Sequence, residues 1–226
     1  ASDHPLASSW QASAASAEAL AFVGRGDSTE LADVRGYLGS DSRPTTYHLA
    51  RRILANAPGH SDRPTLISRL RQLQGPDGAF GARAGYTGTV LDTALALRAL
   101  AAADIAPDNP TVTAATNFLL NRQRSDGSWA AGEGNAEVFA TAQAMRGLQS
   151  SVHRSEVASA LDAGRQWLLG RRGADGGLGD AWRTAAGILA VAPNAPSKTV
   201  YSDTVSALRD AQNSDGSWSG DAFTTA

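Results

Sequence analysis

The sequence predicts an all-α fold built from repeated helical hairpins, and three observations support this prediction. A short motif centred on Asp-Gly occurs four times, a Thr-Ala pair follows each copy and opens an apolar run, and alanine is abundant throughout. Self-similarity at a near-fixed spacing is typical of repeat architectures. Alanine favours helix and lets helices pack closely. Segments of alternating β-branched residues are absent from the sequence, so we expect almost no sheet.

The turn motif reads Gln (once Arg), two variable residues, Asp, Gly, one variable residue and a large apolar side chain. Its aspartates are separated by 49, 49 and 40 residues, and the four copies span residues 74–80, 123–129, 172–178 and 212–218. Glycine takes positive φ at no steric cost, and Asp can bond its own backbone two residues on. We therefore expect a tight turn, with the Gln amide bonding helix-end groups and the final aromatic residue joining neighbouring hairpins.

The Thr-Ala pairs mark the helix after each turn. They begin at Thr93, Thr141, Thr184 and Thr225, and the first two continue as TALALRAL and TAQAMRGL. Each repeat therefore reads as helix, Asp-Gly turn, helix. The segment 89–103 is apolar around most of its circumference, which is typical of a helix buried on both faces.

Start and stop signals place the helices in order along the chain. A capping Ser with acidic residues in the first turn opens the second helix. Asp62 is expected to cap the fourth helix, with Pro64 tolerated in its first turn. The helices are expected at 9–23, 28–38, 45–56, 62–72, 89–103, 109–122, 136–149, 156–171, 181–191 and 199–211, with the opening turn of another at 221–226.

The repeats resemble the Gln-Trp repeat of the terpenoid cyclases and protein prenyltransferases over residues 62–226, and more weakly before them. The resemblance implies an α/α toroid with two concentric helix layers, here about five helical hairpins plus the start of a sixth. The family's closed ring has six hairpins, so we expect one toroid domain over residues 1–226 that continues past Ala226. The same ring occurs in enzymes, cobalamin carriers and thioester domains, so it specifies function less than fold.

Composition excludes several functions. The sequence has no Cys, which removes disulfides, thiolate zinc sites, a Cys nucleophile and an internal thioester. The net charge of −2 and the lack of a basic stripe argue against nucleic acid as a partner. No run approaches the length of a membrane span. The chain begins with Ala1 rather than Met, which favours a mature end after signal-peptide removal and hence a secreted or cell-surface protein.

The resemblance also shows which catalytic groups are missing. Cyclases of the squalene–hopene type protonate their substrate with the middle Asp of an Asp-x-Asp-Asp motif before Thr-Ala. The matching stretch, residues 89–94, keeps only Asp92 and has Leu91 at the acid position. Paired carboxylates are absent from the other copies as well. The zinc set of the prenyltransferases needs Cys, and the histidines are scattered, so we assign no catalytic residue, metal ligand or cofactor.

The starts of the inner helices are the candidate ligand-binding positions, because rings of paired helices place mostly apolar pockets at their centre. The candidates are Tyr47, His48, Tyr86, Asp92, Glu137, Phe139 and Trp182. An alternative reading makes the two acids first-turn residues favoured by the helix dipole and the aromatic residues core packing. The turn residues Trp129 and Trp218 are expected to be structural.

Three functions fit the sequence. The first is a non-catalytic exported domain that binds a small molecule, cobalamin-like or isoprenoid, in or at the rim of the ring. The cobalamin carriers share ligand capture with a second domain, so a second domain after residue 226 would fit this function. The second is a terpenoid cyclase or prenyltransferase-like enzyme acting on an isoprenoid. The third is a surface scaffold or interaction domain.

Overall fold

The computed structural model describes residues 9–22, 29–40, 43–56, 61–132, 134 and 137–218. Within these residues the chain forms ten α-helices and three short 3-10 helices, and it forms no β-strand. Extended pairing in the same residues is limited to two isolated bridges, Gln74 with Phe80 and Gly81 with Gly88. These findings confirm the predicted all-α class.

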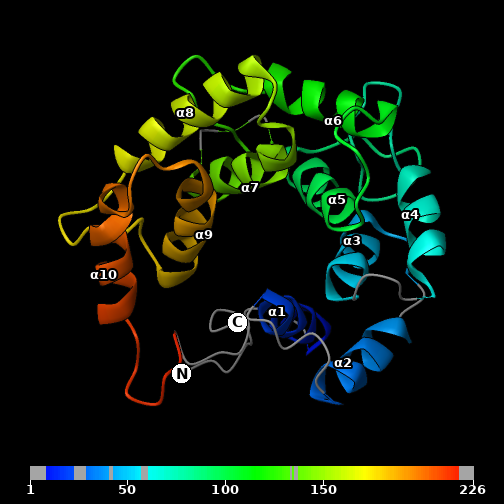
Figure 1. Cartoon of the computed structure of the whole chain (residues 1–226), viewed down its shortest axis with the longest axis horizontal. Coiled ribbons are helices and arrows are strands. Elements are labelled where there is room, and N and C mark those ends of the chain that lie inside the picture. Colours follow the sequence, from blue (N-terminus) through cyan, green and yellow to red (C-terminus); the bar gives the residue numbers. More distant parts are fainter. Residues whose placement is uncertain are drawn as a thin grey trace.

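The helices form two concentric layers arranged around an arc (Figure 1). The inner layer holds the odd-numbered helices α1 (Ser9–Phe22), α3 (Thr46–Ala55), α5 (Val90–Ala102), α7 (Val138–Leu148) and α9 (Ala181–Val191). The outer layer holds α2 (Thr29–Gly39), α4 (Arg63–Arg71), α6 (Pro110–Asn121), α8 (Ser155–Leu169) and α10 (Ser202–Asp210). The 3-10 helices are η1 (Gln149–Ser151), η2 (Ala192–Asn194) and η3 (Lys198–Tyr201).

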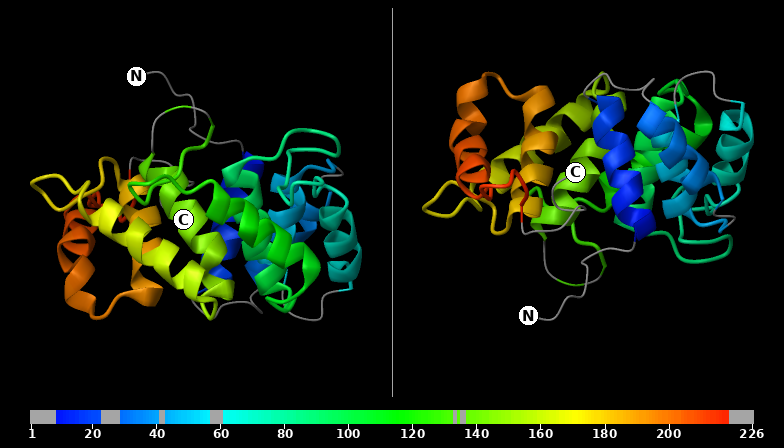
Figure 2. Two further views of the ribbon diagram at one scale, coloured as in Figure 1. Left: turned by 90° about the horizontal axis from the view of Figure 1, so that it is seen from above. Right: turned by 90° about the horizontal axis from the view of Figure 1, so that it is seen from below.

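Each inner helix packs against the outer helix that follows it and against the inner helices on either side. Figure 2 shows the same helices edge-on, with their axes running, at a tilt, from one face of the ring to the other. The arrangement confirms an α/α toroid of five hairpins. The expected start of a sixth hairpin at 221–226 lies outside the described residues.

The expected helix boundaries agree with the structure to within a few residues, and the range 181–191 coincides with α9. Two details differ. The last helix begins three residues later than expected, at Ser202, because the backbone of Tyr201 (φ −127°, ψ 14°) leaves the helical region after η3. Asp62 occupies the cap position of α4, but its side chain makes no capping bond and instead faces Arg52 at 3.6 Å.

The turn motif adopts the predicted conformation in all four copies. The glycines have φ of 83°, 89°, 84° and 83° at Gly78, Gly127, Gly176 and Gly216. In each copy an Asp oxygen accepts a hydrogen bond of 2.9–3.1 Å from the backbone N–H two residues on. A Cβ at Gly127 would lie 2.6 Å from the Ala163 carbonyl oxygen, so this turn also packs directly on the next outer helix, α8.

The Gln amide of the motif ties its own turn to that next helix. Gln123 Nε2 donates to the carbonyls of Gly127 at 3.0 Å and Ala160 of α8 at 2.8 Å. Gln74 bonds Gly78 and Thr111 of α6 in the same way, both at 2.9 Å. Thr111 lies in the first turn of α6, as expected for a helix-end group, whereas Ala160 lies in the second turn of α8.

The aromatic residue at the end of the motif joins neighbouring hairpins. Trp129 is fully buried and its Nε1 donates to the Leu119 carbonyl at 2.8 Å. A Cβ on Gly164 of α8 would lie 3.1 Å from the indole ring, so the ring packs between α6 and α8. Trp218 makes the same bond to Leu208, at 2.6 Å.

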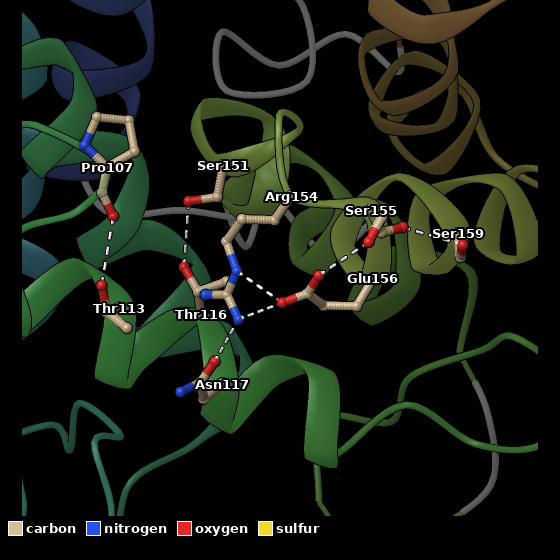
Figure 3. A network of polar contacts seen from close by, with 9 residues as sticks. All are labelled: Pro107, Thr113, Thr116, Asn117, Ser151, Arg154, Ser155, Glu156 and Ser159. Atoms are coloured by element: carbon tan, nitrogen blue, oxygen red, sulfur yellow. Dashed lines mark hydrogen bonds and ion pairs between the residues drawn. The ribbon is translucent and has the colours of Figure 1, made fainter.

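Polar groups also join the middle of α6 to the segment that precedes and starts α8 (Figure 3). Arg154 donates to the Asn117 amide oxygen of α6 at 2.8 Å and to Glu156 of α8 at 2.7 Å. The hydroxyls of Thr116 and Ser151 lie 3.3 Å apart in a buried position beside this pair. These bonds fasten α6 to the start of α8 on the outside of the ring.

Two hydrophobic clusters stabilise the ring. The larger cluster fills the space between the layers from α3 to α9, and the smaller one joins α1 and α2 to the end of α3. Tyr47 packs against both clusters. The first hairpin is therefore attached to the ring through a core of its own, with Trp10 as its largest buried side chain.

We expect Trp129→Ala to lower the free energy of unfolding by about 3–5 kcal/mol, because it leaves a cavity between two outer helices. Urea denaturation followed by circular dichroism measures the loss. Trp218→Ala is the matched control, since Trp218 makes the same hydrogen bond but is only partly buried, and its loss should be smaller. An equal loss in both variants would contradict the bridging role of Trp129.

Candidate functional site

In the three Thr-Ala pairs that lie within the described residues, the threonine fixes the register of its inner helix. Its hydroxyl accepts the backbone N–H of the last turn residue, at 2.9 Å for Thr93, 3.0 Å for Thr141 and 3.0 Å for Thr184. Positions on the inner helices can therefore be counted from this threonine. Two positions on the inner helices carry the residues of the candidate site. One lies two residues before the threonine, and the other lies five residues after it. Seven residues are close to two helical turns, so both positions lie on one face of the helix.

The position two residues before the threonine is apolar in three consecutive hairpins, with Leu91, Phe139 and Trp182. The structure brings the two aromatic candidates together, with ring centroids 4.4 Å apart and ring planes inclined by 42°. Trp182 is 38% exposed, and Leu189, seven residues on in α9, is 42% exposed. An accessible apolar strip therefore runs along α9 beside Phe139.

The position five residues after the threonine carries arginine in three hairpins, namely Arg51, Arg98 and Arg146. In α1, Glu18 stands five residues after Ser13, which is also followed by Ala. The Glu18 carboxylate contacts all three guanidinium groups, Arg51 at 2.5 Å, Arg146 at 3.4 Å, and Arg98 through a hydrogen bond. We call these four residues the arginine cluster.

Burial and charge act against each other in the arginine cluster. Burial by itself would raise the pKa of Glu18, but the positive charges of Arg98, Arg51 and Arg146 hold this pKa below its usual value. Burial also lowers the pKa of the Arg146 guanidinium, and the positive charge of Arg98 lowers it further. The single carboxylate of Glu18 therefore forms ion pairs with three guanidinium groups in a poorly solvated environment.

Tyr47 and His48 lie beside this cluster, at the start of α3. Their rings pack on Trp10 of α1, at centroid distances of 5.9 Å and 4.4 Å. His48 Nδ1 lies 2.6 Å from the hydroxyl of Thr45, the residue that caps α3. The Arg51 guanidinium lies 5.4 Å from the centre of the Tyr47 ring, so the aromatic group and the arginine cluster are continuous.

Asp92 is engaged in capping α5. Its backbone N–H donates to the Thr89 hydroxyl at 3.0 Å, and that hydroxyl donates to the Asp92 carboxylate at 2.9 Å. Burial raises the pKa of Asp92, and the hydrogen bond from Thr89 opposes the rise. These capping bonds stabilise the first turn of α5. The role of Asp92 as a ligand-binding residue stays a prediction.

Glu137 and Tyr86 lie on connectors and not on the inner helices. Glu137 occupies the cap position of α7 without a side-chain capping bond, and it is exposed. Tyr86 is 63% exposed in the Gly-rich segment before α5. A groove of about 420 Å³ follows that segment and is lined by Thr89, Val90, Phe118 and Arg122, among others. The roles of Glu137 and Tyr86 as ligand-binding residues stay predictions.

Metal ligands do not gather in the part of the chain that the structure describes, where no three His, Asp or Glu residues come together. In the same part, no helix has the length and apolar character needed to cross a membrane.

The arginine cluster escaped prediction from the sequence, although a signal for it exists. Arginine follows the threonine by five residues in both TALALRAL and TAQAMRGL, and Thr46 precedes Arg51 by the same interval. Repetition of a charged residue at one register of an apolar inner helix indicates a shared location. Glu18 carries no such signal, because the first helix lacks both the turn motif and a Thr-Ala pair.

Comparison with known proteins agrees with this architecture. A family model described as the squalene-hopene cyclase C-terminal domain matches residues 87–202. A search of curated proteins found no match.

Several solved structures share the fold. A protein from Actinoplanes is 19% identical with a TM-score of 0.70, over 93% of this chain and 72% of that one. The type II terpene cyclase MstE from Scytonema, in a variant bound to geranylgeranyl dihydroxybenzoate, is 15% identical with a TM-score of 0.75, over 92% and 70%. The ent-copalyl diphosphate synthase from Streptomyces platensis is 20% identical with a TM-score of 0.71, over 96% and 48%. Identities this low show similarity of fold alone.

We expect acid to destabilise the protein partly through Glu18. A carboxyl group whose pKa is lowered by folding contributes stability above its unfolded pKa, near 4.5, and loses it as the pH falls through the folded value. The wild type should therefore lose stability more steeply than Glu18→Gln below about pH 4.5 in urea denaturation series.

Glu137→Gln is the control for this series, because it removes an exposed carboxylate that has no ion pair among the described residues. Its pH dependence should follow the wild type. Identical acid slopes for Glu18→Gln and the wild type would show that the ion pairs of Glu18 do not contribute to the free energy of unfolding.

Proposed function

Because the chain belongs to the squalene-hopene cyclase C-terminal domain family, we propose that it binds an isoprenoid along the inner face of its ring, without cyclising it. The pairing of Phe139 with Trp182 carries this proposal. Two aromatic rings in contact, one of them accessible, present a flat apolar surface that suits the branched chain of an isoprenoid. Leu91 on α5 continues the apolar position, and Leu189 lies seven residues after Trp182 on the same face of α9.

The position of Leu91 supports a binding role without catalysis. In the family motif this position, two residues before the threonine, holds the acid that protonates the substrate. A leucine side chain cannot donate a proton, and the equivalent positions in the next two hairpins are Phe139 and Trp182. Asp92, one residue later, has its carboxylate engaged with Thr89.

The choice of an isoprenoid over a cobalamin-like ligand is supported by the structural neighbours. One of them, a type II terpene cyclase, is bound to geranylgeranyl dihydroxybenzoate. Another is a synthase of ent-copalyl diphosphate. Both names describe molecules with isoprenoid chains.

A second candidate function, a proton-initiated cyclase, is favoured by one observation. Burial raises the pKa of Asp92, so this acid retains its proton to a higher pH than an exposed aspartate would. In this alternative Asp92 is the proton donor, and Asp92→Asn abolishes product formation.

Export and the extent of the domain stay predictions. Fractionation of the native host, with the protein detected by antibody, would test a secreted or cell-surface location. The full-length coding sequence would test for a second domain beyond residue 226. The surface-scaffold alternative gains support if no small molecule binds.

We expect the purified protein to retain an isoprenoid from a mixture of geranylgeraniol, geranylgeranyl diphosphate, squalene and cobalamin, measured by equilibrium dialysis and mass spectrometry. Trp182→Ala should weaken this binding about tenfold or more, because a large aromatic contact is lost. Tyr37→Ala is the control, since Tyr37 is an exposed aromatic residue on the outer helix α2. A ligand consumed and not retained would instead establish the cyclase, and retention of cobalamin alone would exclude the isoprenoid.

We expect Leu91→Asp to give no cyclisation of squalene or geranylgeranyl diphosphate, because Thr89 replaces the first acid of the family motif and the carboxylate of Asp92, its last acid, is engaged with the Thr89 hydroxyl. Gas chromatography of overnight reactions measures product, with Leu91→Asn as the uncharged control. Product formed by Leu91→Asp and not by Leu91→Asn would contradict our account of this position.

A further inference from the structure

We propose that the arginine cluster is an anion-binding site inside the ring for a diphosphate, or another group with several charged oxygens, and that Glu18 is its internal occupant. Three consecutive inner helices each contribute one arginine from the same register, and α1 supplies the only carboxylate that pairs with them among the described residues. The site is separate from the aromatic pair of Phe139 and Trp182, which the proposed function uses.

The charges of the cluster do not balance. Three guanidinium groups face one carboxylate, which leaves two positive charges in excess within the cluster. The arginine side chains are only 17%, 10% and 19% exposed at Arg51, Arg98 and Arg146. Buried charge without a partner is costly, so a group that brings two or more negative charges would be stabilised here.

The geometry of the donors also suits an oxyanion. Each guanidinium presents several N–H groups in a planar fork that matches the oxygens of phosphate or carboxylate. Glu18 uses part of this donor set, and the Nε of Arg51 is buried without a hydrogen-bond partner. A diphosphate has more oxygens than a carboxylate and could occupy donors that Glu18 leaves unused.

Glu18 need not hold α1 in position. This helix packs through Trp10, Ala14 and Ala17 into a hydrophobic cluster with Leu31 and Leu38 of α2. Its attachment therefore has an apolar basis that is independent of the ion pairs. The Glu18 side chain can leave the arginines while the helix stays packed.

The site also extends the proposed function. The arginine position and the aromatic position are seven residues apart on each inner helix, which is about 10 Å along the helix axis. A ligand with an anionic head at the arginines and an apolar chain on Phe139 and Trp182 would span this distance. This extension rests on the proposed function, whereas the anion site itself does not.

Isothermal titration with inorganic pyrophosphate at fixed salt tests the site without any isoprenoid. We expect weak binding by the wild type, about tenfold tighter binding by Glu18→Gln, and no binding by Arg98→Gln. Arg154→Gln is the matched control, because Arg154 pairs with Glu156 on the outside of the ring, and it should bind as the wild type does.

Equal pyrophosphate affinity in the wild type and Glu18→Gln, or undiminished affinity in Arg98→Gln, would overturn the proposal. Circular dichroism establishes that each variant is folded. If Glu18→Gln is not folded, the melting temperature of the wild type decides: pyrophosphate should raise it, and should not raise it in Arg146→Gln. Absence of any shift in the wild type would then overturn the proposal.

Two further ligands separate this proposal from the proposed function. Geranylgeraniol tests the apolar surface alone, and geranylgeranyl diphosphate tests both together. If the protein binds pyrophosphate but does not bind geranylgeraniol, the anion site is supported and the proposed function is contradicted. If geranylgeraniol binds but Glu18→Gln does not bind pyrophosphate, the proposed function is supported and the anion site is contradicted.

Discussion

In three repeats of the described residues, the last N–H of the turn donates to the threonine hydroxyl of the next inner helix, and this hydrogen bond sets the geometry of the ring. The bond is made by buried groups, as at Trp129 and Thr141, so its loss would leave a backbone donor unsatisfied away from water. Because it fixes the rotation of each inner helix relative to the turn before it, the same register faces the ring interior in successive hairpins. The aromatic pair and the placement of Arg98 and Arg146 follow from this constraint. Arg51 lies on α3, whose Thr46 hydroxyl instead donates to the Gly81 carbonyl.

The turn motif also fixes the position of each hairpin relative to the next, because it contacts the following outer helix. Its glycine lies against the backbone of the following outer helix, where a Cβ at Gly127 would collide with Ala163, and its glutamine bonds the same helix. The inner helices approach as closely, since a Cβ at Gly147 of α7 would lie 2.8 Å from the Ala94 Cα of α5. Small residues at these contacts let the hairpins curve into a ring with few gaps between them.

The sequence predicted the features that depend on local physics. Positive φ at the turn glycines and the Asp bonds within the turn follow from residue type alone, and both were confirmed. The contact between Phe139 and Trp182 was predictable once both were placed at the start of an inner helix. The partnership of Glu18 with Arg146 was not, because the two residues are 128 positions apart and α1 carries no repeat motif. The arginines recur at one position of the repeat, whereas Glu18 occurs once, so the sequence around Glu18 contains no repeated pattern that would indicate the ion pair.

The arginine cluster bears on the chemistry that the ring can support. An acid that protonates an alkene must hold its proton, whereas an excess of positive charge lowers the pKa of any nearby carboxyl group and favours its ionised form. A cyclising isoprenoid also carries positive charge, which three guanidinium groups inside the ring would repel in a poorly solvated setting. The pKa of Asp92, beside Leu91, is raised, so the first effect is confined to carboxyl groups in contact with the cluster, such as Glu18. The second effect opposes cyclisation wherever a carbocation comes near the arginines, and it is absent if the ligand is bound unchanged. In our proposal, the same residues that would repel a carbocation hold an anionic head group, and the ligand is bound without being converted.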